Sequence, residues 1–250
     1  MEIGAQFFTL RDFCKTTEDL AETLKKVRDI GYKTVQISGT CAYDPAWLKS
    51  ELDKNELHCV LTHTSGDRMR YDTESVIEDH NILDCKYIGL GYFPMSAVKE
   101  DDSPAHFFEL YTPVAKAFAQ RGKYFMYHNH DMEMQKKDGK PLLQILAEGF
   151  APELVGFTLD TFWIQAGGGD PAQWIEKLSC RVPCIHLKDF AYGRKMEVIG
   201  EGNINFDRVF AKAEVAGTKY MLVEQDDCNG HDPFDCLRRS YEYLKACGFN

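Results

Sequence analysis

Two histidines separated by one amide stand in the segment YFMYHNHDMEM, residues 124–134. The segment begins as an apolar run typical of a buried strand and continues into His128, Asn129 and His130, with Glu133 shortly after. Imidazole nitrogens bind divalent metals and also exchange protons near neutral pH. Side chains two positions apart on a strand share a face, so His128 and His130 are predicted to point together, with Asn129 turned away.

Ionisable side chains of the same kind stand at the ends of four other apolar runs. Scattered polar residues would not favour one end of the strands, so these side chains are predicted to converge on one site. By the same alternation, His186 shares a face with Lys188, and Glu224 shares one with Asp226. In chain order the residues are His63, Asp160, His186 followed by Lys188, and Glu224 followed by Asp226.

Histidine and carboxylate ligands together suit one divalent ion such as Mn²⁺, Zn²⁺, Co²⁺ or Mg²⁺. Such an ion would act as a Lewis acid on a carbonyl or hydroxyl of a substrate. Glu224 is predicted to be a catalytic base, with His130, His63 or Lys188 as its partner. The predicted metal ligands are His128, Asp160, His186 and Glu224, and the predicted substrate contacts are His63, Trp163, Lys188 and Asp226.

Several of these residues also have a purely structural interpretation. Asp160 could cap the following turn, since Asp is common there. His186 could be a core histidine bonded to the backbone, and Lys188 with Asp189 could be a solvated ion pair of small value. The glycine run QAGGGDP, residues 165–171, is interpreted as a flexible loop before a helix rather than as a phosphate site, because no P-loop Lys follows. The histidines His80, His106 and His231 are interpreted as surface or helix residues.

The elements that must position these side chains alternate along the chain. Strands that alternate with helices imply parallel crossovers, and eight such units in 250 residues predict a (β/α)₈ barrel as one domain, residues 1–250, with a doubly wound sheet as the alternative. A barrel places its site at the carboxyl ends of the strands. The apolar runs cover 3–10, 34–38, 58–65, 87–93, 124–129, 154–160, 182–189 and 220–226, and the amphipathic stretches cover 16–31, 44–55, 72–84, 104–122, 141–150, 170–179, 205–217 and 232–248.

Composition narrows the class of partner. The net charge of −10 disfavours a nucleic acid as the default partner, because duplex binding needs phosphate neutralisation. The nine cysteines are scattered without a CxxC pair, which is typical of a reduced compartment. No run reaches the roughly 20 apolar residues of a membrane span, and the start lacks the long apolar stretch of a signal peptide. A cytoplasmic protein is expected, and a homo-oligomer is possible.

The sequence resembles the sugar phosphate isomerase/epimerase family, the xylose isomerase-like barrels that also include endonuclease IV and inosose dehydratase. The resemblance implies a (β/α)₈ barrel with one metal held by Glu, Asp, His and Glu from strands five to eight, and Asp160, His186 and Glu224 match three of these. It runs through IGAQFFTLRD, LKKVRDIGYKTVQISG, YHNHDMEM, LDTFWIQAGGGDP, IHLKD and LVEQD.

His128 stands where many members of that family carry the first glutamate. In the isomerases two metal-bound glutamates move a proton between neighbouring carbons, and here one carboxylate is missing. Glu133 is expected to lie outside the ligand set. One base with a metal is sufficient for proton abstraction and β-elimination, so a lyase or dehydratase of a keto-sugar or keto-polyol is the alternative to an isomerase or epimerase. An endonuclease IV-like enzyme, whose trinuclear zinc site needs more ligands, and a non-catalytic binder are further hypotheses.

Overall fold

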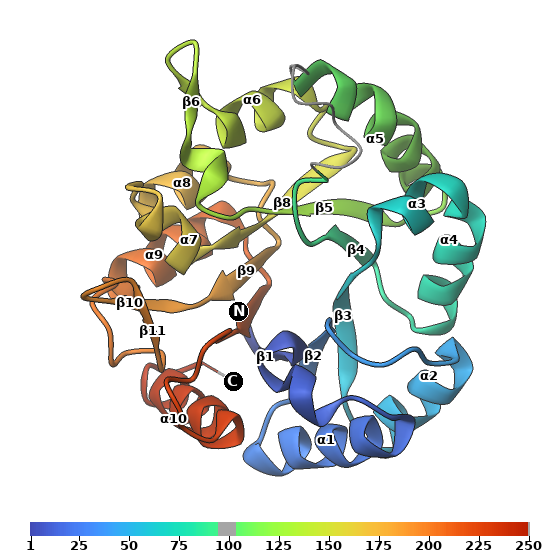
Figure 1. Cartoon of the computed structure of the whole chain (residues 1–250), viewed down its shortest axis with the longest axis vertical. Coiled ribbons are helices and arrows are strands. Elements are labelled where there is room, and N and C mark those ends of the chain that lie inside the picture. The colour runs from blue at the N-terminus through green and yellow to red at the C-terminus, as the bar shows by residue number, and fades with distance from the viewer. Residues whose placement is uncertain (95–103, 250) are drawn as a thin grey trace.

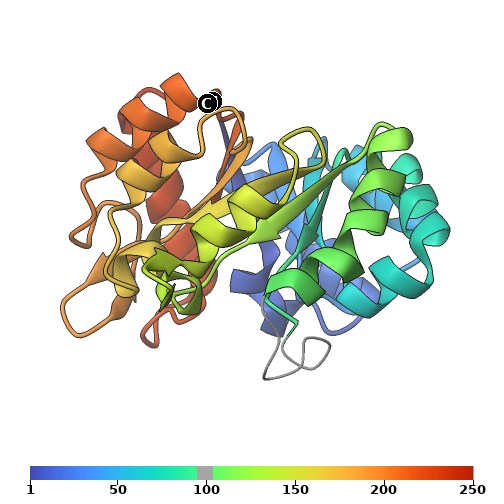
Figure 2. The same cartoon turned by 90° about the horizontal axis from the view of Figure 1, so that it is seen from above.

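The predicted apolar runs form one closed parallel barrel in the computed structural model, which describes residues 1–94 and 104–249 (Figures 1 and 2). The (β/α)₈ prediction is confirmed. Around the barrel the strands are β1 (Glu2–Gln6), β12 (Tyr220–Val223), β9 (Cys184–Leu187), β8 (Val155–Asp160), β5 (Tyr124–His128), β4 (Tyr87–Leu90), β3 (His58–His63) and β2 (Thr34–Ile37), which pairs with β1 again.

Helices surround the barrel on its outside (Figure 1). The eight predicted amphipathic stretches are confirmed, and two short helices, α3 and α7, come in addition. The helices are α1 (Thr17–Ile30), α2 (Pro45–Lys54), α3 (Gly66–Tyr71), α4 (Thr73–Ile82), α5 (Pro104–Gln120), α6 (Leu142–Gly149), α7 (Thr161–Ala166), α8 (Pro171–Lys177), α9 (Phe206–Ala216) and α10 (Pro233–Ala246).

Several strands end earlier than predicted. Strand β1 stops at Gln6, and Phe7–Phe13 form the 3-10 helix η1, so the second half of the predicted run 3–10 is wrong. The Gln6 side chain accepts a hydrogen bond from the Phe8 N–H, which caps this helix and ends the strand. Strands β9 and β12 end at Leu187 and Val223, one residue before the polar side chains that follow them.

Small elements also decorate the carboxyl end of the barrel. Two antiparallel hairpins, which the sequence did not predict, follow β5 and β9. They are β6 (Lys136–Lys137) with β7 (Lys140–Pro141), and β10 (Asp189–Ala191) with β11 (Lys195–Glu197). A 3-10 turn, η2 (Met132–Met134), precedes the first of them.

The barrel interior is apolar up to the level of the site. An inner cluster, separate from the main core between strands and helices, consists of Val60, Leu61, Tyr87, Met126, Cys184 and Leu222. Three of its members stand two positions before a predicted metal ligand on the same strand or directly after it, so the strand period turns both side chains inward. These pairs are Met126 with His128, Cys184 with His186, and Leu222 with Glu224.

Two further expectations can be compared with the structure. All nine cysteines are free. Within residues 1–94 and 104–249, every helix is too short or too polar to cross a bilayer. That residues 1–250 form a single domain stays a prediction, because residues 95–103 and 250 lie outside the described residues.

His80 lies on helix α4, which agrees with its interpretation as a surface or helix residue, and its side chain is buried, with 4% exposed. Its Nδ1–H donates to the Val76 carbonyl at 2.6 Å, and its Nε2 lies 2.7 Å from the Thr62 hydroxyl. Burial lowers the pKa of His80 to about 4, and Lys123 lowers it further against the opposing effect of the Val76 carbonyl. The imidazole is therefore neutral in the folded protein.

This burial predicts a pH-dependent stability. Between pH 6.5 and 4 the unfolded chain binds a proton at His80 that the folded chain does not, so the free energy of unfolding falls as the pH drops through this window, by up to roughly 1.4 kcal/mol per pH unit. Urea unfolding of wild type and His80→Gln at several pH values measures the slope, which should be smaller in the variant by the contribution of His80. His231→Gln, at an exposed histidine, is the control. Equal slopes in wild type and His80→Gln would contradict this account.

Candidate metal centre and active site

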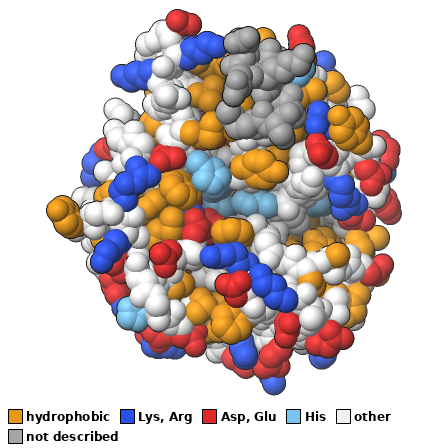
Figure 3. All heavy atoms as spheres, viewed as in Figure 1, with side chains coloured by type: hydrophobic (Ala, Val, Ile, Leu, Met, Phe, Trp, Pro, Cys, Tyr) orange, Lys and Arg blue, Asp and Glu red, His pale blue; other side chains and the backbone are white. Residues whose placement is uncertain are grey.

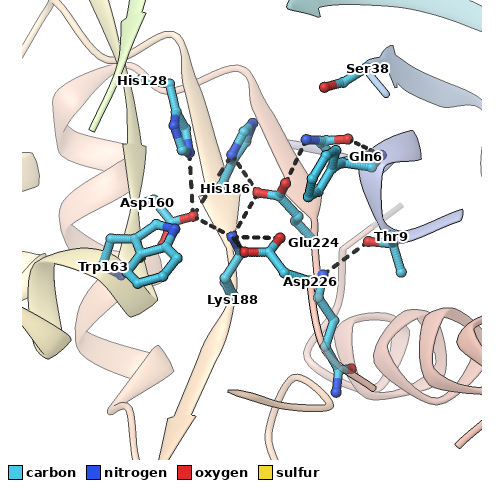
Figure 4. A network of polar contacts seen from close by, with 12 residues as sticks. Gln6, Thr9, Ser38, His128, Asp160, Trp163, His186, Lys188, Glu224 and Asp226 are labelled. Atoms are coloured by element: carbon cyan, nitrogen blue, oxygen red, sulfur yellow. Dashed lines mark hydrogen bonds and ion pairs between the residues drawn. The ribbon is translucent and has the colours of Figure 1, made fainter. Parts of the chain in front are cut away.

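Four side chains from neighbouring strands converge at the carboxyl end of the barrel (Figure 4). They are fully or almost fully buried, and one ligand atom from each lies within 4.8 Å of the others. The strands that carry them, β5, β8, β9 and β12, are successive neighbours in the barrel, which explains how residues far apart in the chain meet. These are the four predicted metal ligands His128, Asp160, His186 and Glu224, and as a group they could bind a metal ion.

His128 is held in one tautomer. Its Nδ1 lies 3.3 Å from the Gly91 carbonyl, which can only accept, so Nδ1 carries the proton. The lone pair therefore sits on Nε2, which lies 3.5 Å from Oδ2 of Asp160 and has no hydrogen-bond partner among the described residues. Burial lowers the pKa of His128 well below its usual value, and His186 lowers it further, so the ring is neutral. A lone pair aimed at a carboxylate is repulsive unless a cation stands between them.

His186 repeats the arrangement with its nitrogens exchanged. Its Nε2 lies 2.7 Å from Oε1 of Gln36, so with the amide in this orientation Nε2 is the donor and Nδ1 holds the lone pair. Nδ1 approaches Oε2 of Glu224 at 2.8 Å and Oδ2 of Asp160 at 3.9 Å without hydrogen-bonding geometry. The imidazole thus directs a second nitrogen to the same point.

In each of the two carboxylates, one oxygen accepts a hydrogen bond from the scaffold and the other faces the site. Oδ1 of Asp160 accepts the Trp163 N–H at 2.9 Å and caps helix α7, so the predicted capping role is correct and does not exclude a ligand role. Oε1 of Glu224 accepts from Nε2 of Gln6 at 2.6 Å. The other oxygen of each, Oδ2 and Oε2, faces the site, where its ion pair with Lys188 is its contact with a permanently charged group among the described residues. Hydrogen-bond partners of this kind orient metal ligands in known sites.

Lys188 is the cation of the site and is 1% exposed (Figure 4). Its Nζ lies 3.1 Å from Asp160, 3.0 Å from Glu224 and 3.0 Å from Asp226. Burial lowers the pKa of Lys188, but the three carboxylates outweigh burial and raise it above its usual value, so the ammonium stays charged. The interpretation of Lys188 as half of a solvated pair with Asp189 is therefore wrong.

The pKa values of the three carboxylates shift in different directions. Burial raises the pKa of Asp160, and it also raises that of Asp226 to about 6, where Glu224 adds to the rise and Lys188 opposes it. Burial would raise the pKa of Glu224 too, but Lys188 and His186 outweigh it and hold that pKa well below the usual value. With three carboxylates and one ammonium the cluster carries a formal charge of −2 at neutral pH, which a divalent ion would neutralise.

A cavity of about 370 Å³ opens above the cluster, and Figure 3 shows histidines gathered in the hollow at the centre of this face. Its walls include the predicted residues His63, His130, Lys188 and Asp226 as well as His128 and Glu224, whereas Asp160 and His186 lie beneath it. Burial lowers the pKa of His63 to about 3 and that of His130 to about 4. Both imidazoles are therefore neutral.

Three other residues lie beside the cavity rather than in its wall. Asn129 is turned away as predicted, and its Oδ1 accepts the Asp160 N–H at 3.0 Å. Glu133 is outside the ligand group and accepts hydrogen bonds from the Tyr127 hydroxyl and the His130 N–H. Trp163 lies behind the cavity wall, with its ring centre 5.3 Å from that of His130. Substrate contact by Trp163 stays a prediction.

Two glutamines of the site were not predicted from the sequence. Gln6 and Gln36 are fully buried on β1 and β2, and they hold Glu224 and His186 through the hydrogen bonds described above. The sequence did contain an indication of their roles, which is the polar amide inside each of the apolar runs IGAQ and TVQI. A buried amide requires a hydrogen-bond partner.

The comparisons with known proteins agree with this architecture. Residues 24–247 match the family described as Xylose isomerase-like TIM barrel. A comparison with curated proteins by sequence gives no match.

Solved structures resemble the chain over nearly its full length. A sugar phosphate isomerase/epimerase from Parabacteroides distasonis ATCC 8503 has a TM-score of 0.83 at 21% identity, covering 98% of this chain and 93% of that one. An L-ribulose 3-epimerase has 0.76 at 15%, covering 98% and 94%. The probable 3-DHS dehydratase AsbF from Bacillus anthracis has 0.72 at 16%, covering 98% and 99%. At these identities the likeness shows a common fold, and together with the family match it leads to one conclusion: the chain belongs to the xylose isomerase-like TIM barrel family.

Proposed function

We propose that the protein is a metal-dependent isomerase or epimerase of a small sugar, sugar phosphate or keto-polyol. The observation that carries the proposal is the set of four buried ligand atoms, two imidazole nitrogens and two carboxylate oxygens, that lie within 4.8 Å of one another, with Lys188 as the only lysine or arginine among the described residues that pairs with the two oxygens. The structural relatives that are named as sugar epimerases and isomerases support the same substrate class.

The donor set fits a divalent ion. His128 and His186 would supply neutral nitrogens, and Asp160 and Glu224 would supply oxygens. Mixed imidazole and carboxylate donors favour Mn²⁺, Co²⁺ or Zn²⁺ over Mg²⁺, which prefers oxygen alone. When bound, such an ion supplies Lewis-acid polarisation of a substrate carbonyl or hydroxyl.

The remaining chemistry is assigned to three residues of the chain. Glu224 is ionised and lines the cavity, so it can accept a proton from a carbon next to a carbonyl. Lys188 is a charged donor beside it that can hydrogen-bond an oxygen on which negative charge develops. His130 follows β5, which β8 and β9 separate from β12 around the barrel, and its neutral ring can accept or return a proton from that wall.

A lyase or dehydratase acting on a keto-sugar or keto-polyol is the second candidate. It is favoured by the distribution of acids in the cavity wall, where both described carboxylates, Glu224 and Asp226, come from the end of β12, and the β3 and β5 side presents imidazoles. Elimination needs one carboxylate base and one acid, and Glu224 with Lys188 would provide them.

Metal binding predicts a change in stability. A ligand at 100 times its Kd stabilises the folded state by about 2.7 kcal/mol, so Mn²⁺ or Zn²⁺ should raise the melting temperature of chelator-treated protein. His128→Gln should remove most of that rise and weaken the affinity measured by calorimetry, because it deletes one donor of four. His58→Gln is the matched control. His58 is exposed at the start of β3 and does not belong to the ligand group, so this variant should behave as wild type. Unchanged affinity in His128→Gln would exclude this residue as a ligand.

Proton abstraction predicts solvent exchange. Metal-loaded protein incubated in D₂O with a panel of ketoses and aldoses should introduce deuterium next to the carbonyl, which nuclear magnetic resonance detects. Glu224→Gln should slow exchange by roughly 10²-fold or more, as expected for loss of a general base, while Glu214→Gln on the exposed side of α9 should not. Release of water from a keto substrate without epimer formation would identify the dehydratase instead. Absence of both reactions across the panel would count against the proposed function.

A further inference from the structure

The loop after β9 already surrounds an anionic group, which is the carboxylate of Asp189 from the chain itself. Barrel enzymes often bind substrate phosphate at the loops after the seventh and eighth strands, through backbone N–H groups. Here the N–H groups of Phe190, Gly200, Gly202 and Ile204 all donate to the buried carboxylate of Asp189, at 2.8 to 3.2 Å. A Cβ on Gly202 would lie 2.5 Å from Asp189 Oδ1, so this position requires glycine. The cradle has no room for a phosphate.

The loop after β12 is acidic. Residues 224–232 read EQDDCNGHD, with four carboxylates and no lysine or arginine. Two of the four, Glu224 and Asp226, line the cavity. A phosphate placed at this loop would meet like charge, which is unfavourable at short range.

The glycine run QAGGGDP offers no free amides to the cavity. The N–H groups of Gly167, Gly168 and Gly169 donate to the carbonyls of Trp163, Gln165 and Ile164, which end helix α7. The interpretation of this run as a connection rather than as a phosphate site agrees with these bonds.

The positive charge of the described cavity wall is also committed. Lys188 is the only lysine or arginine in the described part of the cavity wall, and three carboxylates surround it. Arg11, beside the wall, donates to the carbonyls of Phe8 and Asp226. Residues 95–103, outside the described part of the chain, contain Lys99 against three acids, so their sequence adds no net positive charge.

The rest of the wall suits uncharged hydroxyl groups. Ser38, Thr64 and Ser65 present hydroxyls that can donate and accept, and the rings of Phe8 and Tyr92 present apolar surface. This combination matches a sugar, which carries hydroxyls on a C–H framework.

We propose that the substrate is an unphosphorylated, uncharged sugar or polyol rather than a sugar phosphate. The inference rests on the proposed function for the identity of the cavity as a sugar site. It narrows that function, because the anion-binding amides of the loops are occupied by the chain and the cavity wall holds no uncommitted cation among its described residues.

Paired ligands test the inference. Binding of D-allulose, L-ribulose and D-fructose to Mn²⁺-loaded protein is compared by calorimetry with binding of their terminal phosphate esters, and deuterium exchange is measured on each pair. The free sugar should bind at least about tenfold more tightly than its ester, which corresponds to roughly 1.4 kcal/mol. Equal or tighter binding of the esters would overturn the inference.

A charge introduced into the wall should change the preference. Ser65 is exposed, lines the cavity and makes no side-chain cap bond at the start of α3, so Ser65→Lys adds an uncommitted ammonium at small structural cost. It should move the ratio of ester affinity to free-sugar affinity toward the ester by about tenfold. Ser50→Lys, on the exposed side of α2, gives the same net charge away from the cavity and should leave the ratio unchanged. An unaltered ratio in Ser65→Lys would contradict the proposal.

The two proposals fail in different ways. Exchange on the esters but not on the free sugars leaves the proposed function standing and removes this inference. Tighter binding of free sugars without exchange or elimination on any pair removes the proposed function and supports the account of the cavity's charge. If neither member of any pair binds, both proposals fall.

Discussion

The convergence of two imidazole lone pairs and two carboxylate oxygens on one buried point is the constraint around which the barrel mouth is organised. Each of these atoms alone would be costly to bury without a partner. Together they form a group that could bind a cation at its centre. The opposite atom of each side chain is tied to the scaffold, through the Gly91 carbonyl, the Trp163 N–H, Gln36 and Gln6. The scaffold therefore fixes which atom of each residue is offered.

Lys188 shows how the cluster tolerates so much buried charge. Its ammonium contacts three carboxylates at about the same distance, and this partial neutralisation offsets much of the desolvation cost that isolated buried charges would carry. A formal charge of −2 remains, which matches a divalent ion. The same comparison of positive and negative groups, applied to the loops around the cavity, supports the proposal that the cavity binds hydroxyl groups rather than a phosphate.

Much of the fold and of the site could be predicted from the sequence because both depend on short periods. Alternation of period two places His128, His186 and Glu224 above interior apolar residues, and the repeated strand–helix pattern predicts the barrel that brings their strands together. Tautomers and partners could not be predicted, because they depend on which side chains meet across strands. Gln6 and Gln36 acquire their roles only through contacts 218 and 150 residues away in the chain. The burial of Lys188 and the cradle around Asp189 depend likewise on loops whose course has no periodic pattern.

The two oxygens of Asp160 have an evolutionary consequence. One oxygen starts helix α7 and the other faces the candidate metal centre, so a single side chain would serve both folding and the proposed chemistry. Selection for a folded chain alone would preserve an oxygen acceptor at this position, which asparagine also provides. A descendant that abandoned the reaction could therefore drift to asparagine here while keeping its helix, whereas drift to alanine would remove both contributions at once. Asparagine at this position in a relative would mark a barrel that has retained the start of helix α7 and given up one carboxylate donor of the candidate site.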